Sequence, residues 1–187
     1  QKVEMKDDVP IGRIIINKKG EFLSEVSWND MVAGAMDSIW GYVTGSLKDV
    51  TFEIYAREDI KAADGESDDY YKKDELVATI KTDELGIART DDLPLGKYYV
   101  VEKETADGFV LDGEPRDIDL TYRDQDTPVV TFDSEWQNSR QKAKVIVTKK
   151  EKDYDRVLEG GVFALCAKED IKNTDGDVLV KADTIME

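Results

Sequence analysis

The chain repeats part of itself, and an internal repeat constrains the fold more strongly than any single motif. Residues 47–66 (LKDVTFEIYAREDIKAADGE) and 158–177 (LEGGVFALCAKEDIKNTDGD) align without a gap and are identical at nine of twenty positions. An apolar run ending in two lysines precedes each copy, IIINKK at residues 14–19 and VIVTKK at residues 145–150. This repeat predicts tandem modules of a longer array, one complete and one present only as its start.

Short β-branched and aromatic runs recur through the first copy, as is typical of an all-β sandwich. The runs predicted as strands cover residues 13–17, 50–56, 76–82, 96–104, 116–122 and 127–135, with 145–149 and 161–167 in the second copy. The gaps between them are rich in the turn residues Asp, Gly and Pro. We expect a connector over residues 1–10, a complete sandwich over 11–140 and a truncated second module over 141–187.

The first module carries an insert at about residues 20–46 that the second copy lacks. Lys18 and Leu47 are 29 positions apart, whereas Lys149 and Leu158 are 9 apart, so the first copy has twenty extra residues. Its apolar residues fall at near-helical spacing, although Gly34 and the tryptophans disfavour a helix. These residues are Trp28, Met31, Val32, Ala35, Met36 and Ile39. We expect the insert to pack on the sandwich.

The composition excludes several classes of function. With 42 acidic and 26 basic residues, the net charge of −16 disfavours nucleic acids and anionic membranes as partners. The absence of histidine removes the commonest general base and metal ligand, and Cys166 is the only cysteine, so neither a disulfide within the chain nor a thiolate zinc site is possible. No apolar run approaches membrane-spanning length. We predict no enzyme acting on other molecules, no cofactor and no membrane insertion in this segment.

Two acidic loops, residues 64–69 and 175–177, are rich in the oxygen ligands that calcium prefers. Neither follows the twelve-residue spacing of an EF-hand, and solvated turns explain both loops more simply. We therefore predict no metal site.

Lys18 continues the apolar run of the first strand. Period two places it on the same face as Ile14 and Ile16, and Lys149 holds the corresponding position in the second copy. A lysine that faces a core is unusual, and burial favours the neutral, nucleophilic amine. The alternative is an edge lysine whose ammonium group reaches water.

Glu102 and Asn138 are the other two residues that could carry chemistry. Glu102 shares a strand face with Tyr98 and Val100, and a buried carboxyl group kept neutral can donate a hydrogen bond and move a proton. The alternative is an exposed carboxylate at a strand end. Asn138 ends the last predicted strand of the first module, where a turn or capping role is the simpler interpretation.

Taken together, these residues resemble the Cna B-type and SpaA-type pilin and adhesin domains of Gram-positive cell-surface proteins. The resemblance covers nearly the whole chain. It is carried by the strand ending in lysine (IIINKK), the paired strands LKDVTFEI and LEGGVFAL, the segment LPLGKYYVVEKETADGF and the strand that runs into Asn138. It implies a Greek-key prealbumin-like β-sandwich.

The resemblance also implies a function and a site. In that family, a lysine and an asparagine form a spontaneous isopeptide bond with the help of an acidic residue. Carried over, Lys18 is the nucleophile, Asn138 the acceptor amide and Glu102 the proton-relaying acid, with Lys19 and Glu104 as rivals. Lys149 has no matching acid or asparagine in its own copy and is expected to be unreacted.

A structural stalk or spacer module of a cell-wall-attached extracellular protein, next to similar modules, is the function that the resemblance implies. The alternative is an adhesin module in which Trp28 and Trp40 of the insert contact a host or glycan ligand, because aromatic rings suit sugars. If both tryptophans are buried, this alternative loses its main support.

Overall fold

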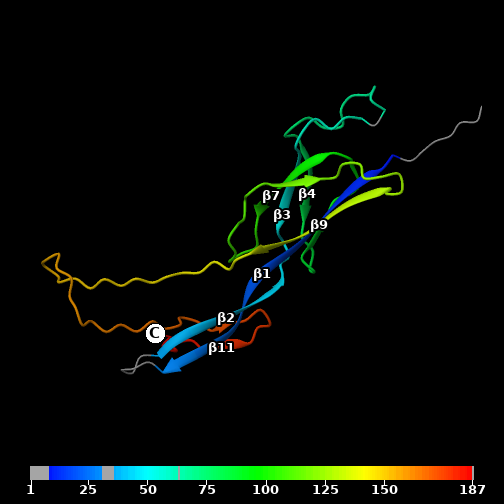
Figure 1. The fold of residues 1–187 in the computed structure, drawn as a ribbon. Helices are drawn as coiled ribbons and strands as arrows, with labels where there is room; N and C mark the ends of the chain where they lie inside the picture. Colours follow the sequence, from blue (N-terminus) through cyan, green and yellow to red (C-terminus); the bar gives the residue numbers. More distant parts are fainter. Residues whose placement is uncertain (1–8, 31–35, 63, 187) are drawn as a thin grey trace, which may run out of the picture. The chain divides into compact units, whose positions relative to one another are not determined.

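The structure, a computed structural model, describes residues 9–30, 36–62 and 64–186. Within these ranges there are strands but no helix, and so none that could cross a membrane (Figure 1). The chain divides into two compact units. Unit 1 comprises residues 1–20 and 45–140, and unit 2 comprises residues 21–44 and 141–187. This division reflects contacts within the fold, so the module boundaries inferred from the repeat stay predictions.

Two sheets form unit 1. In the first, β1 (Ile11–Asp30) pairs antiparallel with β5 (Ile87–Arg89) and β6 (Leu93–Pro94), and parallel with β9 (Val129–Asn138). The second sheet is antiparallel, in the order β4 (Leu76–Lys81), β3 (Thr51–Ala56), β7 (Lys97–Glu104) and β8 (Arg116–Asp119). Figure 1 shows β3 beside β7 in this sheet. The predicted all-β, prealbumin-like sandwich is therefore confirmed.

Period-two alternation builds the core of unit 1. Every second residue is buried from Ile14 to Lys18 of β1, from Phe52 to Ala56 of β3 and from Tyr98 to Glu102 of β7, because successive side chains of a strand point to opposite faces. The buried residues of these strands are Ile14, Ile16, Lys18, Phe52, Ile54, Ala56, Tyr98, Val100 and Glu102. Two charged residues thus stand in an otherwise apolar set, which is costly unless they are paired.

Six of the unit 1 strands lie where the sequence predicts them, whereas β5 and β6 are not predicted. They contain three and two residues, too few for an alternating pattern to be recognised. Both are set by their pairing with β1, a long-range contact.

The insert forms strands, so the near-helical interpretation of its apolar residues is wrong. Trp28 lies in β1, while Ile39 and Trp40 lie in β2 (Met36–Ser46), which neighbours β1 in the sheet. Aromatic and β-branched residues are frequent along β2, and such residues favour an extended backbone. Residues 31–35, including Met31, Val32 and Ala35, lie outside the described residues.

Unit 2 has a small core of its own. It is formed by Ala167, Val180 and Met186, near the short pair β10 (Ile171–Lys172) and β11 (Val178–Val180). Val26, Trp28 and Trp40 of the insert pack against this cluster, together with Ile171 and Leu179. The expectation that the insert packs on the sandwich is therefore wrong for these side chains, whose partners come from the second repeat.

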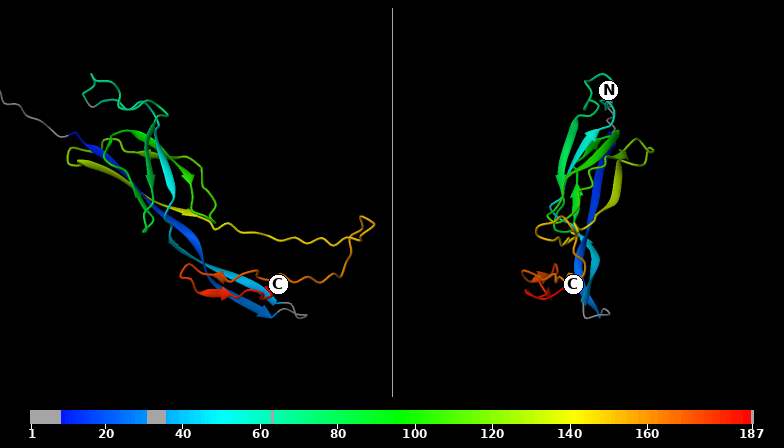
Figure 2. Two further views of the ribbon diagram at one scale, coloured as in Figure 1. Left: turned by 180° about the vertical axis from the view of Figure 1, so that it is seen from behind. Right: turned by 90° about the vertical axis from the view of Figure 1, so that its left-hand side faces the viewer.

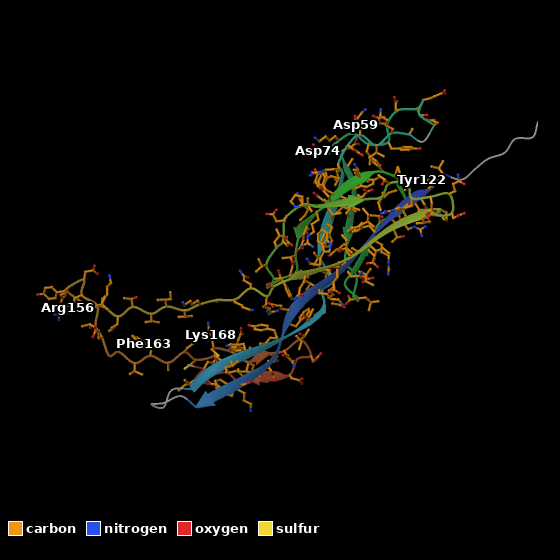
Figure 3. All side chains as sticks on the ribbon, viewed as in Figure 1. Asp59, Asp74, Tyr122, Arg156, Phe163 and Lys168 are labelled. Atoms are coloured by element: carbon orange, nitrogen blue, oxygen red, sulfur yellow. The ribbon has the colours of Figure 1, made fainter. Side chains whose placement is uncertain are left out.

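The strands predicted at residues 145–149 and 161–167 are not formed. Figure 2 shows these residues in an extended arm that runs out and turns back, with an isolated bridge between Lys150 and Val157. Apolar side chains stay in solvent along the arm: Val145 is 64% exposed and Val162 is 96% exposed. Figure 3 shows Arg156 and Phe163 on the same arm. A strand needs neighbours for its backbone groups, and among the described residues this stretch has only the isolated bridges Lys150–Val157 and Cys166–Ile185.

A hairpin motif shows that the two copies share structure as well as sequence. Asp74 N donates to Ala56 O at 2.8 Å in unit 1, and Asp183 N donates to Ala167 O at 2.8 Å in unit 2. Both aspartates have left-handed backbones, with φ of 64° and 63°. The same hydrogen bond therefore returns the chain to Ala56, the last residue of β3, and to Ala167.

Candidate functional site

Lys18 is completely buried. It lies on the core face of β1, and its side chain has 0% exposure. Nζ lies 5.7 Å from the ring centre of Phe52 and 5.9 Å from that of Trp136. Burial lowers the pKa of Lys18, because the ammonium form loses its hydration, while the hydrogen bond and the charge of Glu102 oppose this shift. The structure thus places the amine where burial shifts its equilibrium toward the neutral form.

Glu102 reaches the same point from the opposite sheet. It lies on β7, paired across to Phe52 of β3, and is 1% exposed. Lys18 Nζ donates to Glu102 Oε2 at 2.5 Å. This contact joins the two sheets through the core.

Asn138 completes the group from the end of β9. The parallel pairing of β1 with β9 places Asn138 opposite Gly20, two positions beyond Lys18 and hence on the same face. Lys18 Nζ donates to Asn138 Oδ1 at 2.7 Å, and Asn138 Nδ2 donates to Glu102 Oε1 at 2.5 Å. Asn138 is 1% exposed. One carboxyl group therefore contacts the amine through one oxygen and the amide nitrogen through the other.

The structure separates the predicted residues from their rivals. Lys19 pairs with Gln137 and points to the opposite face of β1 from Lys18, where it is partly exposed. Glu104 is exposed and accepts a long hydrogen bond of 3.4 Å from the Thr51 hydroxyl. Of the two lysines and two glutamates, only Lys18 and Glu102 lie in the buried group.

Sequence reasoning missed Thr105. Asn138 Nδ2 donates a second hydrogen bond to Thr105 Oγ1 at 2.8 Å, so both amide hydrogens have acceptors. Thr105 directly follows Glu104, inside the segment that carries the family resemblance. Its place in that segment was the one indication that Thr105 could belong to the site. A threonine in a turn is common, so the local sequence did not mark it as a site residue.

A second layer surrounds the group. The guanidinium of Arg116 lies 4.1 Å from the ring centre of Trp136 and donates to Asp112 Oδ2 at 2.5 Å. Arg116 and Asp112 act in opposite directions on the pKa of Lys18, since the positive charge lowers it and the negative charge raises it. Their effects are smaller than those of burial and of Glu102.

Lys149 has a different environment from Lys18. It is exposed on the extended arm, outside any strand. Its carbonyl accepts a hydrogen bond from Leu158 N at 2.9 Å. The shared sequence position therefore does not produce a shared site.

The acidic loops form no metal cage in the described part of the chain, where no three acidic or cysteine side chains are grouped to bind an ion. Asp64 instead accepts hydrogen bonds from the backbone of Glu66 and Ser67, each at 3.0 Å. Such bonds close a turn by themselves.

The sequence profile of the SpaA prealbumin-like fold domain matches residues 42–136, half of the chain. The chain belongs to this SpaA family. The match includes Glu102 but ends two residues before Asn138 and begins after Lys18. No curated protein matches the chain.

Solved structures similar to this SpaA-type chain include three Gram-positive pilins. GBS52, the minor pilin of Streptococcus agalactiae, is 16% identical, with 76% of this chain and 50% of that one covered and a TM-score of 0.46. The major pilin SpaD of Corynebacterium diphtheriae is 21% identical, and the alignment covers 75% of this chain and 32% of SpaD, with a TM-score of 0.42. The shaft pilin SpaA of Lactobacillus rhamnosus GG is 21% identical, and the alignment covers 89% of this chain and 63% of that pilin, with a TM-score of 0.41. The chain spans half or less of the length of the first two.

Proposed function

We propose that this chain is a stalk or spacer segment of a Gram-positive surface pilin or pilin-like protein, stabilised by an isopeptide bond that it forms by itself. Lys18 is the nucleophile, Asn138 the acceptor and Glu102 the acid. The observation that carries the proposal is the contact of these three side chains in a core where none is more than 1% exposed. Membership in the SpaA family supports it.

The geometry suggests the path of the protons. A proton passes from the Lys18 ammonium to Glu102 Oε2 along their 2.5 Å contact, which leaves a neutral amine and a neutral acid. The transfer leaves no charge on either group, and charges in a dry core are costly. The lone pair of Lys18 Nζ then attacks Asn138 Cγ, which puts a positive charge on Nζ and a negative charge on Oδ1.

Glu102 can also serve the leaving group. Its Oε1 lies 2.5 Å from Asn138 Nδ2, so the carboxyl group can return a proton to that nitrogen. The Cγ–Nδ2 bond breaks and ammonia leaves, while Nζ gives its surplus proton back to Glu102, so that a neutral amide between Nζ and Cγ remains. Since every reactant is held by the fold, effective molarities of about 10⁵ M or more are available to the reaction.

The bond would join the first strand of unit 1 to its last. β1 and β9 are parallel neighbours, paired from Ile11 with Val129 to Gly20 with Asn138. Tension along the chain would then pass through a covalent link between Lys18 and Asn138 instead of through hydrogen bonds alone. This property suits a load-bearing stalk in series with neighbouring modules.

The intact mass of the denatured chain tests the bond. We expect a deficit of one ammonia, abolished in Lys18→Ala and in Asn138→Ala but present in Lys19→Ala. Tandem mass spectrometry of a digest should find the peptides of Lys18 and Asn138 joined. An unmodified mass in a correctly folded chain would contradict the bond and leave only the family assignment.

The alternative of a glycan-binding or host-binding insert has weaker support. Trp28 and Trp40 are partly buried and pack against the core of unit 2, so their rings are not free platforms. We therefore favour the stalk, outside the cell and attached to its wall. Detection of the protein in isolated cell-wall fractions, with its absence from the cytosol, tests this location.

A further inference from the structure

The insert has an apolar partner in unit 2. Val26, Trp28 and Trp40 come from the two strands of the hairpin at residues 21–44, and they pack against a cluster from the second repeat. The cluster consists of Ala167, Val180 and Met186, exposed by only 2–8%. Two large aromatic side chains thus cover a core that is otherwise very small.

The first copy of the hairpin motif shows how its apolar face is covered in unit 1. In unit 1 the motif buries Ala56 and Ile60, at 0% and 2% exposure, within its own module. A Cβ added to Gly96 would lie 3.1 Å from the Ile60 side chain, so Ile60 packs closely against the backbone of Gly96. Gly96 directly precedes β7, and this face of the motif is therefore covered by the segment that leads into β7. In unit 2, Val26, Trp28 and Trp40 of the hairpin pack against the corresponding cluster around Ala167.

The same motif in unit 2 keeps its internal bonds. Lys73 N donates to Asp59 Oδ1 at 2.8 Å, and Ala182 N donates to Asp170 Oδ1 at 2.9 Å, so the aspartates hold equivalent turns. Figure 3 shows Asp59 and Asp74 on the unit 1 motif. The motif itself is therefore conserved between the copies, and what differs is the layer that covers its apolar face.

Polar contacts join the hairpin to the segment that enters the second repeat. Lys142 Nζ lies 3.5 Å from Glu21 Oε2 and 4.5 Å from the ring centre of Tyr42. One side chain thus contacts β1 and β2 together. Exposed contacts of this kind contribute little energy each, but they set orientation.

We propose that the insert is a docking hairpin, which supplies core side chains to the repeat that follows it in the chain. Its partner is the hairpin motif of a SpaA-type repeat, here residues 167–186. Trp28, Trp40 and Val26 cover the apolar cluster of this motif. This role does not depend on the isopeptide bond.

Hydrogen exchange of the full chain, followed by mass spectrometry, tests the docking hairpin. In the double variant Trp28→Ala/Trp40→Ala, we expect amides of residues 167–186 to exchange on the order of tenfold faster or more, because their local opening loses its apolar cover. Peptides from β3 and β7 should keep their exchange rates. Trp28→Phe/Trp40→Phe should retain most of the protection.

A matched control uses the same hairpin. Ile39 and Val43 are 47% and 54% exposed, so Ile39→Ala/Val43→Ala should leave residues 167–186 unchanged. Equal exchange in wild type and in the Trp→Ala variant would overturn the proposal. If the double variant also loses protection in β3, the milder Val26→Ala decides: faster exchange confined to residues 167–186 supports docking, and no change there refutes it.

Discussion

Gly20 and Asn138 lie opposite one another in the parallel pairing of β1 with β9. A Cβ on Gly20 would lie 2.5 Å from Phe109 Cε1 and 3.2 Å from Leu47 Cδ2, well inside normal contact distances. Phe109 is 9% exposed and follows the turn after β7. The missing side chain of Gly20 thus gives an aromatic ring room beside the strand position that faces Asn138.

Gly20→Ala should therefore destabilise unit 1 by about 1–3 kcal/mol, because overpacking forces the Phe109 ring or the backbone to move. Denaturant unfolding in an Asn138→Ala background, which cannot form the bond, measures this loss. Gly113→Ala is the control, since no atom lies within 4 Å of its added Cβ. Equal destabilisation by both variants would contradict the steric explanation.

Glu102→Gln should stop or strongly slow bond formation while leaving unit 1 folded. Glutamine has the shape of glutamate but can neither take the proton from Lys18 nor return one to Asn138. The fraction of chain that has lost ammonia, followed by intact mass after refolding, measures the effect. Glu104→Gln should form the bond at the wild-type rate. Slow bond formation in Glu104→Gln together with a normal rate in Glu102→Gln would show that Glu104, and not Glu102, is the proton-relaying acid.

Thr105→Val should slow formation of the isopeptide bond, because the Asn138 amide would be held less firmly in its orientation. The hydroxyl accepts one of the two amide hydrogens at 2.8 Å, and valine leaves that donor without its acceptor inside the protein. The loss of one such hydrogen bond corresponds to about tenfold in rate. Thr105→Ser should restore the time course, whereas equal rates for Val and Ser would exclude a role for the hydroxyl.

The unlinked protein should become more stable as the pH rises. Burial lowers the pKa of Lys18 in the folded chain below the ordinary 10.5. At pH values between the folded-state pKa and the unfolded-state pKa, the unfolded chain therefore binds more protons than the folded chain. The free energy of unfolding of Asn138→Ala should therefore increase with pH through this window, relative to Lys18→Met/Asn138→Ala. Urea titrations at several pH values from about 7 to 10 measure the difference. A constant difference would show that Lys18 titrates normally.

Pulling on the two ends of the chain should reveal the covalent link. With the bond in place, residues 19–137 lie inside a closed loop and contribute no extension when force is applied. Single-molecule stretching of wild type should thus lack the long unfolding step that Asn138→Ala shows. A long step in a chain whose mass proves the bond would contradict the proposed path of force.

Local sequence pattern identified the strand faces of two of the site residues. Period two alone placed Lys18 with Ile14 and Ile16, and Glu102 with Tyr98 and Val100, on faces that the structure buries. The pattern left Lys19 and Glu104 as rivals, because it does not say which face of a strand meets the core. Thr105 stayed unrecognised, since its role depends on a contact with Asn138 that is 33 positions away.

The second repeat shows the limit of the same reasoning. Residues 145–149 have the apolar pattern of β1, yet they form no strand, since strand formation needs backbone partners that local sequence does not provide. In the insert, the apolar residues have a spacing close to that of a helix, yet the insert forms β2, which pairs with β1.

The sequence by itself determined the all-β class, the repeat and the face on which each residue of a regular strand lies, because these follow from composition and from a period of two. Only the tertiary structure decided that Lys18, Glu102 and Asn138 meet, and that Trp28 and Trp40 pack against residues of the second repeat. Those contacts depend on strand register, on the stacking of two sheets and on which partner is present to cover an apolar face. Each is a property of residues far apart in the chain, for which local patterning carries no information.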